Sequence, residues 1–275
     1  MPSFPLETLV MNVSKAILKD NILITFDDKN QPVDILDLSQ TLVGSVREAT
    51  VEKVLKDIEG CILKLDDGIT KAFIENKYLK PEFFVYRHSL KKQVCQADRF
   101  YVCITQDRKD TKPCSCRFVA VCEDKASSIN YFLKELLNSD IVPANDETGV
   151  FHFPSIMEKA MKTKVYLKND ADIVIERTTA LNSIDVNTGK GLKKKDFFTT
   201  NSLAAVEIAR QIRLKRLSGI IIVDFLKDMS KEEQKGLIKL LKDECASDYC
   251  RVDIHGFTSL GLLEMTRERI YEPLI

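Results

Sequence analysis

Hydrophobic and polar positions alternate along this chain with two different periods, and the change of period divides it into regions. Residues 8–38 alternate in short runs that are interrupted by turns at 19–21 and 27–30, which predicts a small β-meander. Residues 42–120 hold five strand-like runs separated by charged turns, which predicts an all-β region. After residue 164, apolar runs alternate with segments of helical period, which is typical of an α/β arrangement.

Four segments have the apolar spacing of amphipathic helices: residues 126–139, 155–161, 202–217 and 231–243. The third is expected to begin at the polar pair Asn201 and Ser202, which are good N-cap residues, and to end before Gly219 as a left-handed C′ residue. The fourth follows a capping-box pattern made by Ser230 and Glu233. These signals predict the helix boundaries.

Two of the later predicted strands each carry an aspartate at or near their ends, Asp185 and Asp224. The β-branched run at 220–223 predicts a central strand that is covered on both faces. An isolated aspartate at a strand end is usually a turn or capping residue. Here, however, one helix joins the two strands, so both carboxylates are expected at the edge where α/β sheets carry function.

Two converging carboxylates predict a particular chemistry. At about 4 Å they repel by roughly 4 kcal/mol at an effective dielectric near 20, so they need a shared proton or a bound cation. Mg²⁺ binds few carboxylates and keeps several waters, one of which can become the attacking nucleophile. Asn187 lies two residues after Asp185, on the same side of the strand, and is expected to support the metal. We therefore predict a hydrolytic Mg²⁺ site in which Asp185 and Asp224 are catalytic.

Basic residues close to this site in the sequence are candidates for binding a polyanionic substrate. They lie in the segment after Asn187 and on one face of the third helix: Lys190, Lys193, Lys194, Arg210 and Arg213. A solvated lysine loop and a soluble helix face explain this grouping nearly as well. Because the formal net charge is zero, any binding of nucleic acid must come from such local patches.

The composition narrows the class of protein. Hydrophobic residues make up 44% of the chain and charged residues 30%, as in ordinary globular proteins. No apolar run is long enough to predict a membrane span, and the N-terminus lacks the pattern of a secretory signal. The eight cysteines show no disulfide-framework spacing and are expected to be reduced in a cytoplasmic protein. The scattered histidines and cysteines make a structural zinc site improbable.

The all-β region at 42–120 suits a small OB-type Greek-key barrel. Such a barrel binds single-stranded nucleic acid on one open face through aromatic and basic side chains. A small barrel without any ligand fits the pattern equally well, so both alternatives stay open here.

Four motifs around the two aspartates resemble, in order, those of the ribonuclease E/G family: ALNSIDVNTGKG, TTNSLAAVEIARQIRL, SGIIIVDFLKDM and GFTSLGLLEMTRER. The resemblance implies a DNase I-like catalytic subdomain in which Asp185 and Asp224 bind the Mg²⁺ that activates water for cleavage of the RNA backbone. Asn187 falls on a supporting position. Arg267 and Arg269, which lie in the last motif, join the candidate RNA-binding residues.

The N-terminal part resembles the family more loosely, as an inserted OB-fold RNA-binding domain. There Phe73 matches an aromatic that stacks on RNA bases, and Lys112 falls near an RNA-contacting lysine. A second aromatic, expected around Leu63–Leu65, is absent. The missing aromatic counts against RNA affinity of the barrel.

The fold class that follows is α+β, with a discontinuous RNase H-like and DNase I-like α/β core and an inserted OB-fold β-barrel. The meander and a helical connection are expected to build the RNase H-like subdomain. In chain order, the expected parts are the meander at 1–40, the barrel at 41–122, the helical connection at 123–163 and the DNase I-like subdomain at 164–275.

Two departures from the family pattern shape the functional hypothesis. The segment between Cys122 and Lys164 is short and lacks the arginine-threonine motif of a 5′-monophosphate pocket, so strong dependence on that group is not expected. The sequence also ends before the cysteine pair through which family members share zinc, so a zinc-linked oligomer is not expected. We predict a hydrolase, an Mg²⁺-dependent endoribonuclease that cleaves single-stranded RNA in RNA processing or decay.

Two alternatives remain beside this hypothesis. A non-catalytic RNA-binding protein derived from a ribonuclease E/G ancestor is favoured by the deletions and the missing aromatic, and opposed by the intact Asp185, Asn187 and Asp224. An unrelated α+β protein with structural aspartates is disfavoured, because four motifs recur in order.

Overall fold

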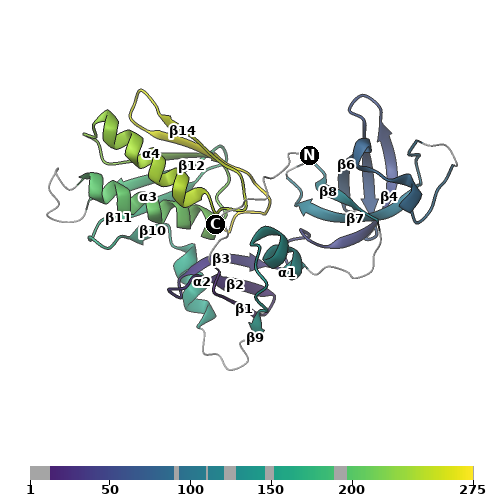
Figure 1. The fold of residues 1–275 in the computed structure, drawn as a ribbon, viewed down its shortest axis with the longest axis horizontal. Helices are drawn as coiled ribbons and strands as arrows, with labels where there is room; N and C mark the ends of the chain where they lie inside the picture. Colours follow the sequence, from purple (N-terminus) through teal and green to yellow (C-terminus); the bar gives the residue numbers. More distant parts are fainter. Residues whose placement is uncertain are drawn as a thin grey trace. The chain divides into compact units, whose positions relative to one another are not determined.

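In the computed structural model, the described residues are 13–89, 93–109, 111–120, 128–145, 152–188 and 197–274. They form a mixed α/β protein that divides into two compact units (Figure 1). The barrel unit comprises Asp37–Asp140 and Ile270–Glu272. The sheet unit combines three segments that are separated in the sequence: Met1–Leu36, Ile141–Arg269 and Pro273–Ile275.

The barrel unit contains one closed sheet in the order β4-β5-β6-β8-β7. Its strands are β4 (Val46–Leu55), β5 (Gly60–Leu65), β6 (Lys71–Glu75), β7 (Arg99–Gln106) and β8 (Cys114–Val119). Strand β7 closes the barrel by pairing with β4, and β6 runs parallel to β8. This five-stranded closure fits the OB-like barrel that the sequence predicted. Every second side chain of a strand points into the barrel: Ala72 and Ile74 are buried, while Phe73 between them faces outward.

Short helical segments complete the barrel unit. They are the 3₁₀ turns η1 (Asn76–Tyr78) and η2 (Pro81–Phe83), the turn α1 (Ser128–Asn130) and the π-helical η3 (Tyr131–Leu136). The helix predicted at 126–139 is therefore present over its described middle part. Phe132 is fully buried and contacts Tyr271 edge-on, at 6.1 Å between ring centroids, which ties the 270–272 segment to this unit.

The sheet unit begins with a four-stranded sheet in the order β3-β2-β1-β9. Its elements are β1 (Lys15–Lys19), β2 (Ile22–Phe26), β3 (Pro32–Asp37) and β9 (Ala144–Asn145), with α2 (Phe153–Met161) packed on it. The predicted meander is confirmed for its described residues, and the expected start of its first strand lies outside them. Ile17, Ile24 and Ile35 share a core with Phe153 and Ala160 of α2.

A six-stranded sheet in the order β10-β11-β12-β13-β15-β14 forms the rest of this unit. The strands are β10 (Lys164–Tyr166), β11 (Asp172–Arg177), β12 (Asn182–Asn187), β13 (Gly219–Asp224), β14 (Val252–Phe257) and β15 (Leu263–Arg267). The helices are α3 (Phe197–Leu214) and α4 (Lys231–Cys245). Strands β12 and β13 run parallel, and the other neighbours pair antiparallel.

Both long helices cover the same face of this sheet, where they lie side by side (Figure 1). Ile221 and Val223 of β13 are buried in one core with Ile208 of α3 and Leu237 of α4. On the opposite face Ile220 is 49% exposed. The prediction that this strand is covered on both faces is therefore wrong, because the two helices belong to a single layer.

Helix α3 does not begin where its capping signal predicted. It starts at Phe197, so Asn201 and Ser202 lie inside the helix rather than at its N-cap. The prediction failed because the Asn201 side chain bonds to a distant loop instead of capping its own helix. Helix α4 begins as predicted, since Ser230 accepts from the Glu233 N–H at 3.2 Å and the Glu233 carboxylate accepts from the Ser230 N–H at 2.7 Å.

The end of α3 also differs from the prediction. Arg216, not Gly219, takes the left-handed conformation after the helix, with φ of 54°. The N–H of Leu217 then donates to the carbonyl of Ile212 at 2.9 Å, as in a Schellman motif. Gly219, with φ of 79°, instead begins β13. Arg216 adopts this left-handed backbone although it is not glycine, and its side chain is paired with buried Asp34.

Buried charges gather beside that helix end. Arg267 is 4% exposed, and its Nε and Nη2 donate to the two carboxylate oxygens of Asp248 at 2.8 and 2.9 Å. Arg216 lies 3.8 Å from Asp34, which also accepts from the Tyr249 hydroxyl at 2.8 Å. Burial raises the pKa of the Asp34 carboxyl, and the Arg216 guanidinium opposes that rise. These contacts join β3, β15 and the end of α3.

Lys215 is a fully buried lysine in the same region. Its ammonium donates to the carbonyl of Ala160 and, at 2.8 Å, to that of Lys162, so it caps the carboxyl end of α2. Burial lowers the pKa of Lys215 to about 8. The carbonyl of Lys215 accepts from the Leu274 N–H at 3.0 Å, which holds the last described residue to this unit.

Seven cysteines fall within the described ranges, and all seven are free thiols. Five of them are buried: Cys61, Cys103, Cys114, Cys245 and Cys250. Burial raises the pKa of Cys245 to about 12, which keeps it a neutral thiol. These five cysteines therefore act as small buried hydrophobic residues, and the seven described thiols are reduced as the sequence predicted.

Within the described part of the chain, no helix is both long enough and apolar enough to cross a membrane.

The ion pair between Arg267 and Asp248 leads to a stability prediction. Asp248→Ala leaves a buried guanidinium without its carboxylate, and breaking such a pair costs about 3–5 kcal/mol. We expect a loss of that order in the free energy of unfolding, measured by urea denaturation. As a control, Glu158→Ala breaks the exposed pair with Lys162 and should cost less than about 0.5 kcal/mol. Similar small losses in both variants would contradict the structural role of the buried pair.

Candidate active site

Asp185 and Asp224 lie side by side in the structure. They are register partners in the parallel pairing of β12 with β13, and theirs is the last pair in that ladder. Neighbouring strands are separated by about 4.8 Å. The sequence prediction that these two distant residues come together is therefore met by the backbone register.

The two carboxylates project from the face of the sheet that the helices leave uncovered. Their chain neighbours Ile184 and Val223 point into the core under α3 and α4, and successive side chains of a strand point to opposite faces. Asp185 is exposed and Asp224 is half-buried. This edge therefore presents negative charge to solvent.

One oxygen of Asp224 is a buried acceptor without a partner. Its Oδ1 has no hydrogen bond among the residues that the structure describes. A buried polar atom without a partner is costly, and a carboxylate oxygen can be satisfied only by a donor or a cation. Carboxylates about 5 Å apart also repel by about 3 kcal/mol at an effective dielectric of 20. This donor set fits a bound divalent cation.

The protein ligands at this edge are few. Among the described residues, no group of three or more histidine, cysteine, aspartate or glutamate side chains could hold a metal ion. Two carboxylates are nevertheless a usual complement for Mg²⁺, which keeps several waters and often binds substrate phosphate oxygens. The residues present therefore favour Mg²⁺ over a metal that needs a full protein cage.

Asn187 ends β12 on the same face as Asp185. Its Nδ2 donates to Oδ1 of Asp172, its register partner on β11, at 3.4 Å. Lys164 holds the other oxygen of Asp172 at 2.9 Å. The amide nitrogen is thus turned toward β11, and the amide oxygen is left available to a ligand on the face that carries Asp185. This arrangement suits a supporting ligand.

The loop after β13 is positioned by a residue whose role the sequence did not reveal. Asn201 is fully buried in α3, its Nδ2 donates to the carbonyl of Leu226 at 2.9 Å, and its Oδ1 accepts from the Leu226 N–H at 3.0 Å. The ladder of β13 ends at Asp224, so Leu226 has no strand partner there. Asn201 supplies the two hydrogen bonds that a neighbouring strand would, and it fixes how the chain leaves Asp224.

Several arginines predicted to bind RNA are occupied inside the fold. Arg267 is buried against Asp248, and Arg213 is 8% exposed with Nε and Nη1 inaccessible to solvent. Arg267 is held by Asp248 in the core and Arg213 is mostly buried, so neither side chain offers an open guanidinium, and their predicted RNA contacts stay predictions. Arg210 is half-buried and bonds Glu207 and, at 3.1 Å, the carbonyl of Pro32. It joins α3 to β3.

Of the other basic candidates predicted for the sheet unit, one lies within the described residues and three lie outside them. Arg269 is half-buried, two residues after the end of β15, and remains a candidate. Lys190, Lys193 and Lys194 lie outside the described residues. Their predicted contacts with RNA stay predictions.

On the barrel, Phe73 occupies the outer face, with its ring lying across Gly60 of β5. A Cβ at Gly60 would come within 2.6 Å of two atoms of that ring, so glycine is needed for this close approach. The exposed side chains of Lys64 and Lys71 lie on the same outer face as register partners of β5 and β6. The alternation of β5 could have identified Lys64, since buried Leu63 and Leu65 flank it. Lys112 is exposed in the turn before β8.

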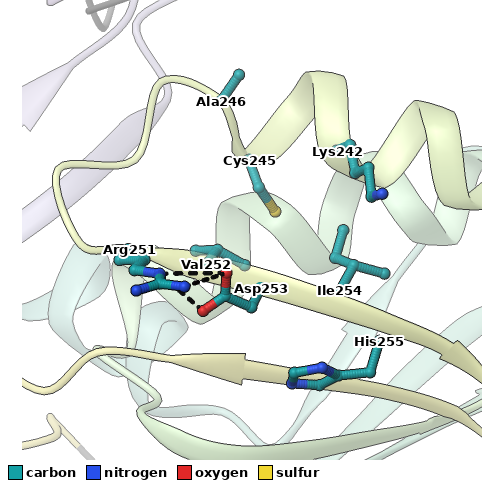
Figure 2. A pocket seen from close by; sticks show the side chains of 8 residues that line it. All are labelled: Lys242, Cys245, Ala246, Arg251, Val252, Asp253, Ile254 and His255. Atoms are coloured by element: carbon teal, nitrogen blue, oxygen red, sulfur yellow. Dashed lines mark hydrogen bonds and ion pairs between the residues drawn. The ribbon is translucent and has the colours of Figure 1, made fainter. Parts of the chain in front are cut away.

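A hollow in the sheet unit lies away from the aspartates. It has a volume of about 500 Å³ and lies between the end of α4 and the edge strand β14 (Figure 2). Figure 2 shows Cys245 pointing into it from α4 and Arg251 turned to Asp253, with Nε 2.9 Å from a carboxylate oxygen. Because β15 separates β14 from β13, this hollow is not part of the paired-carboxylate edge.

The structure thus combines an OB-like barrel with an α/β sheet that carries two paired carboxylates at one edge. This combination is that of a multidomain protein with a candidate metal site. The model of the ribonuclease E/G family matches residues 87–270, which is more than half of the chain. The chain belongs to the ribonuclease E/G family. The resemblance found in the sequence motifs is thereby confirmed.

Individual relatives match a shorter part. Ribonuclease G of Escherichia coli (strain K12) is 33% identical over 129 residues, which are 46% of this chain and 26% of that protein. Ribonuclease G of Haemophilus influenzae is 32% identical over 149 residues, 52% of this chain and 30% of that protein. Ribonuclease E of Escherichia coli (strain K12) is 36% identical over 128 residues, 45% of this chain and 12% of that protein. The chain thus spans less than a third of the length of these relatives.

The Asn201 clamp generates a prediction about stability. Asn201→Ala leaves the N–H and carbonyl of Leu226 without partners, at about 1–3 kcal/mol for each unsatisfied group. We expect the free energy of unfolding, measured by urea denaturation, to fall by about 2–4 kcal/mol. The neighbouring variant Ser202→Ala removes only a bond to the carbonyl one turn earlier and should cost less than about 1 kcal/mol. Equal losses in the two variants would show that the clamp does not hold the loop.

Proposed function

We propose that this protein is an Mg²⁺-dependent endoribonuclease that hydrolyses phosphodiester bonds of single-stranded RNA. The register pairing of Asp185 with Asp224, together with the unsatisfied oxygen of Asp224, carries the proposal. Membership of the ribonuclease E/G family supports RNA as the substrate. The family also supports a role in RNA processing or decay in the cytoplasm.

Each residue of the site is assigned a separate role. Asp224 and Asp185 would hold the cation from neighbouring strands, and Asn187, two residues after Asp185 on the same face, would support it. When bound, Mg²⁺ lowers the pKa of a water ligand and polarises the phosphate. Asp172 keeps the Asn187 amide oriented, and Asn201 fixes the chain directly after Asp224. Each group is thus placed before substrate arrives, which lowers the cost of reaching the reactive geometry.

The outer face of the barrel is proposed to bind RNA. Phe73 offers an aromatic ring, and Lys64, Lys71 and Lys112 offer charges to backbone phosphates. Aromatic stacking with a basic groove is how OB-fold barrels bind single strands without reading a duplex. We therefore retain single-stranded RNA as the substrate class.

The subdomain assignments belong to the same proposal. We assign the four-stranded sheet with α2 to an RNase H-like subdomain and the six-stranded sheet with its helix layer to a DNase I-like catalytic subdomain. The parallel strand pair and the single layer of helices support the second assignment. The expected boundaries remain 1–40 and 123–163 for the first and 164–275 for the second.

The central test is a cleavage assay on an AU-rich single-stranded RNA with Mg²⁺ or with EDTA. Asp224→Asn and Asp185→Asn keep the shape of the side chain and remove its charge, so we expect cleavage to fall by at least about a hundredfold. EDTA should abolish cleavage by the wild-type protein. As a control, Asp243→Asn changes an exposed aspartate of α4 and should cleave as wild type does.

The outcomes separate the two leading hypotheses. If wild type and Asp224→Asn cleave alike, the proposed metal site is wrong. If the RNA is bound but not cut by the wild-type protein in Mg²⁺, the chain is instead a non-catalytic RNA-binding protein of this family. A filter-binding measurement on the same RNA distinguishes this result from a failure to bind.

A second prediction concerns the 5′ end of the substrate. The short segment between Cys122 and Lys164 lacks the arginine-threonine motif of a 5′-monophosphate pocket. We therefore expect kcat/KM for RNAs with a 5′-monophosphate and a 5′-triphosphate to differ by less than about threefold, under about 1 kcal/mol of transition-state stabilisation. The same RNA with a 5′-hydroxyl serves as the control. A strong preference for the monophosphate would contradict this prediction.

A further inference from the structure

A second, smaller hollow lies directly beyond the end of β13. Its volume is about 230 Å³. Three segments form its walls: residues 225–229 after β13, Gln234 in the first turns of α4, and residues 259–261 at the tip of the hairpin between β14 and β15. The first segment begins at the residue after Asp224, so the hollow lies at the end of the strand that carries this aspartate.

Each wall of this hollow is held by its own hydrogen bonds. Asn201 clamps Leu226 through both ends of its amide. Helix α4 is fixed by the capping box at Ser230, whose carbonyl accepts from the Gln234 N–H at 3.0 Å. At the hairpin tip, Thr258 Oγ1 accepts from two backbone N–H groups at 3.2 Å each. The hollow is therefore preformed, which lowers the entropic cost of filling it.

The lining combines apolar walls with polar groups at the rim. Leu226, Met229 and Leu260 supply aliphatic and thioether surface, Gln234 and Ser259 supply an amide and a hydroxyl, and Asp228 adds a carboxylate beside Lys227. Leu260 is 77% exposed, so its apolar surface is open to a ligand. A flat ligand with apolar faces and a polar edge would match this lining.

A nucleobase has that chemistry. Single-stranded nucleic acid is recognised by packing unstacked bases against side-chain surfaces and by hydrogen bonds to their edges. Lys227, which is exposed in the same loop, offers an ammonium to an adjoining backbone phosphate. An apolar side chain of a protein partner would instead leave the Gln234 amide and the Ser259 hydroxyl without partners. The lining therefore favours a base.

We propose that this hollow binds one nucleobase of single-stranded RNA, at a nucleotide adjacent to the phosphate that is cleaved at the paired aspartates. The inference rests on the proposed function and adds to it a determinant of where the RNA is cut. Leu260 packs on the face of the base, and Gln234 contacts its edge. Base preference at this nucleotide then comes from the sheet unit, separately from any contact on the barrel.

The test combines a protein change with an RNA change. In a short single-stranded RNA whose cut site has been mapped, each nucleotide near the cut is replaced in turn by an abasic one. We expect Leu260→Ala to lower kcat/KM on the intact RNA by about five- to tenfold. At one position next to the cut, the abasic RNA should slow wild type by a similar factor and should not slow Leu260→Ala further, because both changes remove the same contact.

The matched control is Val206→Ala, which trims an apolar side chain of α3 that is 42% exposed and should cleave every RNA as wild type does. Leu260 is exposed, so its truncation leaves the core intact, and thermal unfolding should be unchanged. A second variant, Gln234→Leu, should reduce the differences in rate among the four bases at the same position. Each of these readouts reports on the base rather than on folding.

Two results would overturn the inference. One is a Leu260→Ala protein that cleaves as the control does, and the other is a set of losses that multiply at every abasic position. If wild type fails to cleave in Mg²⁺, the proposed function has failed, and the same set of RNAs is then tested for equilibrium binding. Coupling between Leu260→Ala and one abasic position in binding still supports the hollow as a base site, and its absence overturns it.

Discussion

The parallel pairing of β12 with β13 is the constraint on which the candidate site depends. Parallel strands cannot be joined by a tight turn, so the chain crosses over through α3, which packs on one face of the sheet. The crossover brings both carboxyl ends to one edge, and the register then places Asp185 beside Asp224. Because side chains alternate along a strand, a shift of one residue would turn one of these aspartates into the helix-covered core.

Charged residues of helix α3 make contacts inside the sheet unit that its sequence alone does not reveal. Its charged residues resemble a surface for a polyanion, but most are bound within the sheet unit, with Arg210 reaching β3 and Arg213 buried. Directly after the helix, Lys215 and Arg216 are buried as well, against the carbonyls of α2 and against Asp34. The partners of Arg210, Lys215 and Arg216 come from elements far away in the sequence.

Local patterns predicted elements well wherever the signal and its partner lie close together. The five barrel strands, the meander and the capping box of α4 all follow from alternation or from spacing within a few residues. The start of α3 was missed because Asn201 has two competing uses, as a cap or as a clamp on Leu226. The sequence predicted that β13 is covered on both faces, whereas helices cover only one, because an apolar run does not tell how many helix layers pack on a strand.

By itself the sequence determined which residues alternate, where α4 begins, and that two strands each end in an aspartate, since these depend on neighbours in the chain. The tertiary structure alone decided that Asp185 and Asp224 share a register, that one buried oxygen of Asp224 has no partner among the described residues, and that Arg267 is bound within the core. It also decided which loops meet to form a hollow beyond β13. Those properties depend on distances between segments that are remote in sequence, and packing of the whole unit sets such distances.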